Sequence, residues 1–169
     1  MIRYFVGVDP GAGGGLSIVF TNEDAKNRAT FITARAMPTV GVDGKPTLDT
    51  KALETFFPHQ PFVAILEQVG AMPGQGVSSM FQFGRMFGAI EAMLDATAEE
   101  IVYVRPRKWK NYYGIGADKQ AAIDRADAEF GIKEQWHRRG RNGGLMLDHN
   151  SGVAEATLLA LYGVRTYEG

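Results

Sequence analysis

The sequence predicts an α/β fold in which a five-stranded mixed sheet is flanked by helices. The first part of the chain holds three strand-like segments separated by glycine-rich or polar turns, and later helical and strand-like segments alternate. That order is typical of helices packed on a partly parallel sheet. FVAILE (62–67) is continuously apolar, which indicates a strand buried on both faces. With 169 residues, the chain is expected to form one domain, 1–169.

The predicted strands are bounded by turn-forming residues. DPGAGGG (9–15) follows the first strand and permits a tight turn, because glycine adopts positive φ and lets backbones approach closely. Pro38 ends the third strand, and 40–46 is predicted to be a loop. The five strands are expected at 3–9, 16–20, 30–38, 62–67 and 101–106.

The helices are predicted from capping residues and from apolar side chains three to four positions apart. Asp49 or Thr50 is the expected N-cap of the first helix. After position 79, a longer helix carries an apolar stripe, interpreted as core or as a dimer interface, and Gly84 and Gly88 would let another backbone approach it. The remaining helical segments are 48–57, 106–114 (a short helix or a turn), 118–130 and 151–162.

Composition excludes several classes of protein. The chain has no cysteine, which excludes disulfides, thiolate zinc sites and a cysteine nucleophile. Its apolar stretches are far shorter than the roughly 20 residues of a membrane span. The N-terminal segment lacks the layout of a signal peptide, so a cytoplasmic location is expected, or the host cytoplasm if a phage encodes the protein.

Charge is distributed unevenly along the chain. The net charge is −1, yet the segment 105–145 holds ten Lys or Arg against five Asp or Glu. A local positive field attracts a polyanion even when the total charge is near zero. The segment is therefore interpreted as a nucleic-acid surface, with an ordinary mixed-charge surface as the alternative.

Dispersed carboxylates are the main candidates for chemistry. Asp9 ends the first strand, Glu67 ends the fourth, and Glu155 lies in the apolar last helix with Asp148 just upstream. Clustered carboxylates repel one another and persist best where divalent cations neutralise them. If these residues converge, they predict metal-assisted phosphodiester chemistry with two Mg²⁺ ions.

Each acid also has an alternative interpretation. Asp9 can be an Asx-turn residue, or DPGAGG can cradle a phosphate as in sugar-kinase-like ATPases. Glu67 is expected to project from the strand end, where sites of α/β sheets form, or to cap the next loop. Asp148 and Glu155 share a helix face if the last helix is continuous; otherwise Ser151 caps it and leaves Asp148 in a loop. His149 is a candidate metal ligand, a general acid or base, or a surface residue.

The basic segment supplies candidate DNA contacts. Lys110 and Lys119 can stabilise charge on a reacting phosphate. Aromatic residues interleave with these charges and can stack on bases or sugars, although each can equally be core: Trp109, Tyr112 and Tyr113. The residues expected to position the DNA backbone are Arg105, Arg107, Lys108, Arg138, Arg139 and Arg141.

Four segments resemble the RuvC family of Holliday junction resolvases, in its phage-type and organellar branch. They are VGVDPGAGGGLSIV, LEQVGAMPGQGVSSMFQFGRMFGAIE, VRPRKWKNYYGIGADK and DHNSGVAEATLLALYG. The resemblance covers nearly the whole chain and implies an RNase H-like fold. It also implies a homodimer that binds a four-way DNA junction and makes two symmetric nicks, leaving 5′-phosphate and 3′-hydroxyl ends.

The resemblance assigns roles to individual residues. Asp9, Glu67 and Glu155 match the family's metal-binding acids, which implies two Mg²⁺ ions per site with Mn²⁺ as a substitute. Lys110 and Lys119 match lysines near the junction's phosphates, and Lys119 is also expected to take part in catalysis.

The chain departs from the bacterial members at two places. Gly152 stands where they carry another acid or histidine, so Asp148 or His149 is expected to supply the fourth ligand. In place of their aromatic wedge the chain has 68–72, with Met72 as the candidate wedge and Gln75 as a further DNA contact.

The sequence thus predicts a Mg²⁺-dependent endonuclease that resolves branched DNA. One alternative is a protein that binds junctions without cutting them. The other is an ATP-binding, kinase-like protein, which would need a second, duplicated domain.

Overall fold

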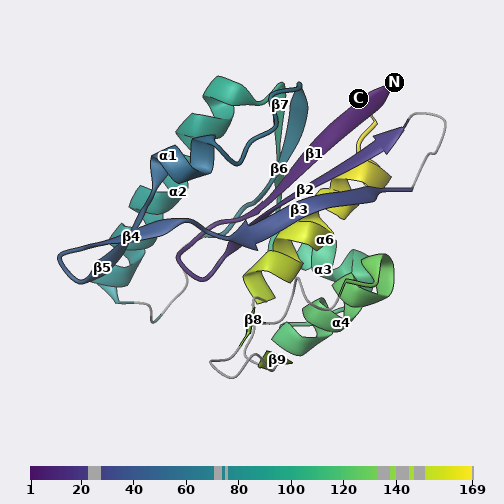
Figure 1. The fold of residues 1–169 in the computed structure, drawn as a ribbon. Helices are drawn as coiled ribbons and strands as arrows, with labels where there is room; N and C mark the ends of the chain where they lie inside the picture. The colour runs from purple at the N-terminus through teal and green to yellow at the C-terminus, as the bar shows by residue number, and fades with distance from the viewer. Residues whose placement is uncertain are drawn as a thin grey trace.

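The computed structural model describes residues 1–22, 28–70, 74, 76–132, 138–139, 145–146 and 151–168, with only the backbone described at 138–139 and 145–146. A twisted five-stranded sheet forms the centre, with helices on both faces (Figure 1). Its strand order is β3-β2-β1-β6-β7. The strands are β1 (Ile2–Asp9), β2 (Gly15–Asn22), β3 (Thr30–Ala36), β6 (Phe62–Glu67) and β7 (Glu100–Val104).

Strand directions make the sheet mixed. β1, β2 and β3 pair antiparallel, whereas β1, β6 and β7 run parallel. The five-stranded mixed sheet flanked by helices, predicted from the sequence, is confirmed. The fifth strand is shorter than predicted, because Pro106 starts a helix instead of ending the strand.

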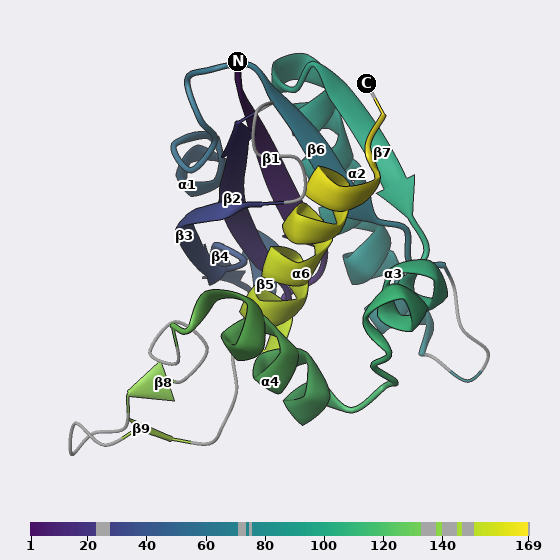
Figure 2. The same cartoon turned by 90° about the vertical axis from the view of Figure 1, so that its right-hand side faces the viewer.

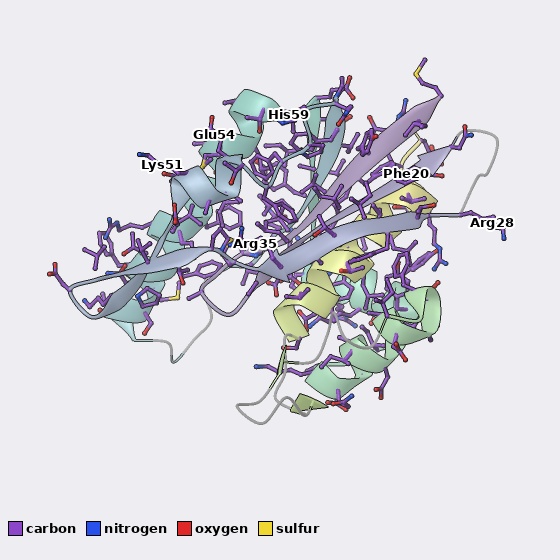
Figure 3. All side chains as sticks on the ribbon, viewed as in Figure 1. Phe20, Arg28, Arg35, Lys51, Glu54 and His59 are labelled. Atoms are coloured by element: carbon purple, nitrogen blue, oxygen red, sulfur yellow. The ribbon has the colours of Figure 1, made fainter. Side chains whose placement is uncertain are left out.

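Two helical layers cover the sheet (Figure 2). α6 (Ser151–Thr166) crosses one face, with α3 (Pro106–Tyr113) and α4 (Lys119–Phe130) beside it. α1 (Thr50–Glu54) and α2 (Val77–Thr97) cover the other face. Strand side chains alternate between the two cores: Phe5 and Ile65 face α6, whereas Val6 and Leu66 face α2. Side chains fill both faces, and charged residues of α1 such as Lys51 and Glu54 lie at the surface (Figure 3).

Capping residues define several helix ends. Asp49 is the N-cap of α1, and its side chain accepts a hydrogen bond from the Ala52 N–H at 3.1 Å. Asp118 caps α4 in the same manner through the Gln120 N–H. Gly114 ends α3 with φ = +67°, a conformation that favours glycine.

The predicted loop at 40–46 is wrong. This segment forms a hairpin of β4 (Thr39–Val42) and β5 (Lys45–Leu48), which pair antiparallel. Asp43 and Gly44 form its turn with φ of +49° and +72°. A type I′ turn requires positive φ at both central residues, and the pair Asp-Gly favours that turn.

Two short strands, β8 (Arg138–Arg139) and β9 (Leu145–Met146), pair antiparallel. Among the helices of the described residues, none is long and apolar enough to cross a membrane.

Candidate metal centre

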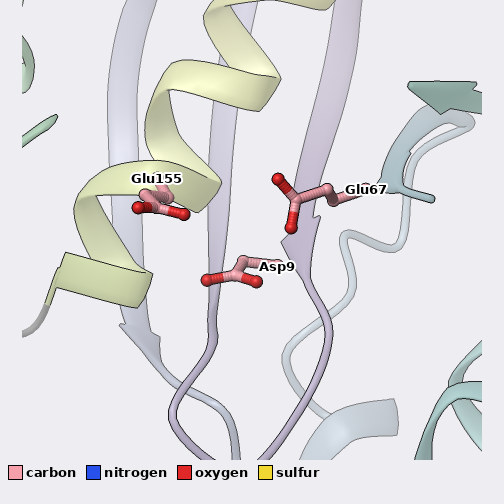
Figure 4. A group of neighbouring side chains, drawn as sticks. All are labelled: Asp9, Glu67 and Glu155. Atoms are coloured by element: carbon pink, nitrogen blue, oxygen red, sulfur yellow. The ribbon is translucent and has the colours of Figure 1, made fainter. Parts of the chain in front are cut away.

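Three carboxylates converge at one edge of the sheet. Asp9, Glu67 and Glu155 each offer an oxygen, and these atoms all lie within 4.8 Å of one another. Figure 4 shows them pointing toward a common space, with Glu155 on the helix and the other two at strand ends. This convergence, predicted from the sequence, joins residues from β1, its parallel neighbour β6 and helix α6.

Strand geometry brings Asp9 and Glu67 together. β1 and β6 are parallel neighbours, and their register pairs Val8 with Leu66. Asp9 and Glu67 are the next residues on each strand, so they lie side by side where both strands end. Because side chains alternate, both carboxylates project to the α6 face, as Phe5 and Ile65 do.

Glycine contacts bring Glu155 to the same place. A Cβ built on Gly7 would lie 1.9 Å from the Ala156 carbonyl oxygen, so α6 rests directly on the backbone of β1. A Cβ on Gly152 would lie 2.4 Å from the Gly13 carbonyl oxygen. The first turn of α6 therefore packs backbone to backbone on the turn between β1 and β2. Position 152 cannot hold a ligand-bearing side chain without displacing that turn.

The same contacts explain the DPGAGGG segment. A Cβ on Gly14 would meet the Asp9 carbonyl oxygen at 2.0 Å, and one on Gly15 would meet the Val153 backbone at 2.7 Å. These glycines serve a tight turn and the approach of α6. Packing thus accounts for them without the phosphate that the kinase-like alternative invoked.

The acids share an environment that disfavours negative charge. Burial raises the pKa of Asp9 well above its usual value, and the charges of Glu67 and Glu155 raise it further, against the opposing ammonium of Lys110. Burial also raises the pKa of Glu67, although the Trp109 hydrogen bond and Lys110 lower it. The ammonium of Lys110 therefore does not offset the burial and repulsion that raise the pKa values of Asp9 and Glu67.

Two consecutive residues of α3 contact this cluster. The Trp109 indole Nε1–H donates a hydrogen bond to Glu67 Oε1 at 2.9 Å. The Lys110 ammonium contacts Glu155 Oε1 at 3.2 Å in an ion pair.

Two sequence predictions need correction here. The sequence allows Trp109 either to stack on DNA or to pack in the core; its side chain is 0% exposed, so the stacking interpretation is wrong and the core interpretation holds. Glu67 was expected to project from the strand end, but it is only 5% exposed because α3 covers it. A buried indole needs an acceptor for its N–H, and this requirement is the sequence signal that could have linked Trp109 to an acid.

The other predicted DNA contacts are distributed around α3 and α4. Arg105 and Arg107 are exposed and line an open hollow of about 530 Å³ with Gln68, just beyond the end of β6. Lys108 is exposed but lines a different hollow, together with the C-terminal half of α6. Lys119 is the exposed first residue of α4. Arg138 and Arg139 lie in β8, and the predictions that fall outside the described residues are Met72, Gln75, Arg141, Asp148 and His149.

The donor set fits a hard divalent cation. Mg²⁺ and Mn²⁺ prefer carboxylate oxygens, and three carboxylates meet here beside the one ammonium of Lys110 among the contacts described above.

The described part of α6 begins at Ser151, so a helix continuous from 148 is outside what the structure describes.

No family model matches the sequence, and the search of curated protein sequences also gives no match. Solved structures do match. Thermus thermophilus RuvC in complex with a Holliday junction substrate aligns with a TM-score of 0.62 at 16% identity, covering 94% of this chain and 91% of that one. A second Thermus thermophilus RuvC structure gives 0.56 at 16% identity, covering 95% of both chains.

The yeast mitochondrial Holliday junction resolvase Ydc2 gives a TM-score of 0.55 at 17% identity, covering 95% of this chain and 77% of that one. All three likenesses extend over nearly the whole chain at low identity. The chain therefore has a RuvC-type fold, and the RNase H-like architecture implied by the resemblance is confirmed.

Proposed function

We propose that this protein is a divalent-metal-dependent endonuclease that cuts branched DNA, with the four-way junction as its substrate. One observation carries the proposal: Asp9, Glu67 and Glu155 converge within 4.8 Å. They do so on a fold shared with a RuvC that has been solved in complex with a Holliday junction.

Asp9, Glu67 and Glu155 would hold the metal, proposed to be two Mg²⁺ ions that Mn²⁺ can replace. Asp148 or His149 is proposed as a fourth ligand. Bound divalent cations supply activation of the attacking water and stabilisation of the leaving 3′-oxygen, which gives 5′-phosphate and 3′-hydroxyl ends.

The cationic residues would act on the phosphate. Lys110 pairs with Glu155 at 3.2 Å, and a cation bound to the cluster would compete for the same carboxylate. Release from Glu155 would free the ammonium to contact the scissile phosphate. Lys119 is proposed to stabilise the transition state. Arg105 and Arg107, which line the hollow next to the centre, are proposed to hold the flanking DNA backbone.

Two symmetric nicks require two sites, so a homodimer is part of the proposal. The outer face of α2 supports it. Val77 is 87% exposed and Phe81 is 64% exposed, which is unusual for large apolar side chains. Gly84 and Gly88 lie on the same helix with open space around them, which permits close approach of a second backbone.

A cytoplasmic site of action, or the host cytoplasm for a phage protein, also stays a prediction.

The test is nicking of a synthetic four-way junction in Mg²⁺. Wild type is compared with Asp9→Asn and with the matched control Asp43→Asn. Asp43 is exposed in the β4–β5 turn, and asparagine tolerates its positive φ. We expect paired nicks from wild type and the control, and at least a hundredfold loss in Asp9→Asn. Equal nicking by Asp9→Asn would refute the site.

Substrate preference is tested with the same protein. Three-way junctions, flaps and linear duplexes of matched sequence should be cut more slowly than the four-way junction. Tight junction binding in EDTA without cleavage in Mg²⁺ or Mn²⁺ would instead support the non-catalytic alternative.

A further inference from the structure

Helix α3 contacts two of the three carboxylates through neighbouring residues. Trp109 donates to Glu67 at 2.9 Å, and Lys110 pairs with Glu155 at 3.2 Å. Glu67 ends a strand and Glu155 lies on a helix that crosses that strand's face. α3 therefore connects the strand and the helix that carry these two carboxylates.

The contact of Trp109 is of a different kind from that of Lys110. Lys110 is partly exposed and charged, so it can move and exchange partners. Trp109 is 0% exposed, and its N–H is the one polar atom of its side chain. Its acceptor, Glu67, is buried as well. A hydrogen bond between a buried donor and a carboxylate is stronger than one at the surface and leaves each group few alternatives.

The indole itself is held by its surroundings. It packs in the core beneath α6, edge-on to Tyr113, with ring centroids 6.5 Å apart at 70°. The Tyr113 hydroxyl donates to the Leu158 carbonyl oxygen at 3.1 Å, which attaches α3 to α6. Tyr112 contacts Tyr162 of α6 edge-on at 5.3 Å. The contact between the Trp109 and Tyr113 rings, which does not involve the Tyr113 hydroxyl, holds the indole, and a donor held by ring packing imposes its direction on the acceptor.

We propose that Trp109 is a positioning residue of the metal centre, whose indole N–H fixes the orientation of the Glu67 carboxylate for divalent-cation binding. Without that donor, the Glu67 carboxylate would lose the partner that sets its orientation, and repulsion from Glu155 would favour other orientations. The inference rests on the proposed function in one respect only, that this cluster binds a divalent cation.

Loss of a hydrogen-bond partner that orients a metal ligand typically weakens metal affinity 10- to 100-fold. The change that removes the donor and keeps an aromatic ring is Trp109→Phe. The matched control is Tyr113→Phe, which removes a different buried hydrogen bond from the same helix and touches no carboxylate. Each variant loses a hydrogen bond in the core beneath α6, so both can lose stability. Only the change in metal affinity distinguishes a positioning role of Trp109 from a structural one.

The experiment is calorimetric titration of the full chain with Mn²⁺ in the absence of DNA, together with thermal unfolding in EDTA. We expect the Mn²⁺ dissociation constant to rise about 10- to 100-fold in Trp109→Phe and to change less than about twofold in Tyr113→Phe. In junction nicking, Trp109→Phe should need correspondingly more Mn²⁺, with its rate approaching the wild-type rate at saturation.

The outcomes distinguish failure of the positioning role of Trp109 from failure of the proposed function. If wild type binds Mn²⁺ and Trp109→Phe binds it equally well, the positioning role is wrong and the proposed function stands. If wild type binds no Mn²⁺, both are wrong. Should Trp109→Phe fail to fold, benzothienylalanine at position 109 keeps the shape of the indole and removes the N–H. Unchanged Mn²⁺ affinity in that variant would overturn the proposal equally.

Discussion

Replacing Asp9 by asparagine should stabilise the metal-free protein while abolishing its metal-dependent activity. Two unit charges 4.8 Å apart repel by about 3 kcal/mol at an effective dielectric constant near 20. Asp9 faces two such neighbours, Glu67 and Glu155, and one cation, Lys110, so the net penalty is about that of one pair. Partial solvation of the site reduces it, and we expect Asp9→Asn to raise the free energy of unfolding by about 1–3 kcal/mol.

The sign of the pH dependence follows from the raised pKa of Asp9. The folded state binds this proton more tightly than the unfolded state, so stability falls as pH rises through and above the unfolded value near 4. The gain from Asp9→Asn should therefore be large at pH 7.5 and small near pH 4. At 2–4 °C per kcal/mol for a chain of this size, the midpoint of thermal unfolding should rise by roughly 2–12 °C.

Thermal unfolding by circular dichroism in EDTA measures this effect. Addition of Mg²⁺ should raise the wild-type midpoint and leave that of Asp9→Asn nearly unchanged, because binding to the folded state alone stabilises it. Asp43→Asn controls for loss of a carboxylate elsewhere. A midpoint for Asp9→Asn at or below that of wild type in EDTA at pH 7.5 would refute the account of mutual repulsion.

Three further predictions follow from packing and charge. Gly152→Ala should lower the free energy of unfolding by about 1–3 kcal/mol or more, since its Cβ meets the backbone at 2.4 Å, whereas Gly41→Ala, in the exposed strand β4 with nothing within 4 Å of the added Cβ, should be neutral or stabilising by up to about 1 kcal/mol in urea denaturation. Lys110→Met should lower the melting midpoint in EDTA because it removes the cation nearest Glu155, and a midpoint that does not fall would contradict the role of the ion pair. Glu129→Gln should destabilise more near neutral pH than at pH 3, because Arg165 holds the pKa of Glu129 below its usual value and that stabilisation declines as pH falls below the usual value; an equal effect at both pH values would argue against it.

The convergence of Asp9 and Glu67 was predictable because the ends of buried strands, and the face to which each side chain points, can be inferred from apolar runs in the sequence. Asp9 and Glu67 each end an apolar run, and parallel neighbours end at the same edge. The turn chemistry of the β4–β5 hairpin was also present in the sequence as Asp43-Gly44. Short, largely exposed strands beside it gave no clear alternation of apolar and polar residues, so the segment was assigned to a loop.

The sequence pattern alone does not decide between stacking on DNA and burial for Trp109. Its neighbours in the chain are cationic and an aromatic residue is common in cores, and the fold decides for burial because one side of α3 packs under α6. Gly152 is a related case. The sequence shows that glycine stands where bacterial members carry an acid or histidine, but it does not show why. The reason that position 152 needs glycine is its contact with the backbone of Gly13, 139 positions earlier in the chain.

The metal centre unites residues from the two ends of the chain. Asp9 and Glu155 are separated by 146 positions, and α6 must lie across β1 before the third carboxylate reaches the other two. During translation, a nascent chain that has emerged through β6 carries two of the acids and lacks the third. The order of synthesis thus leaves the cluster incomplete in a partial polypeptide, and under the proposed function the protein becomes competent to cut DNA only after α6 has left the ribosome and docked.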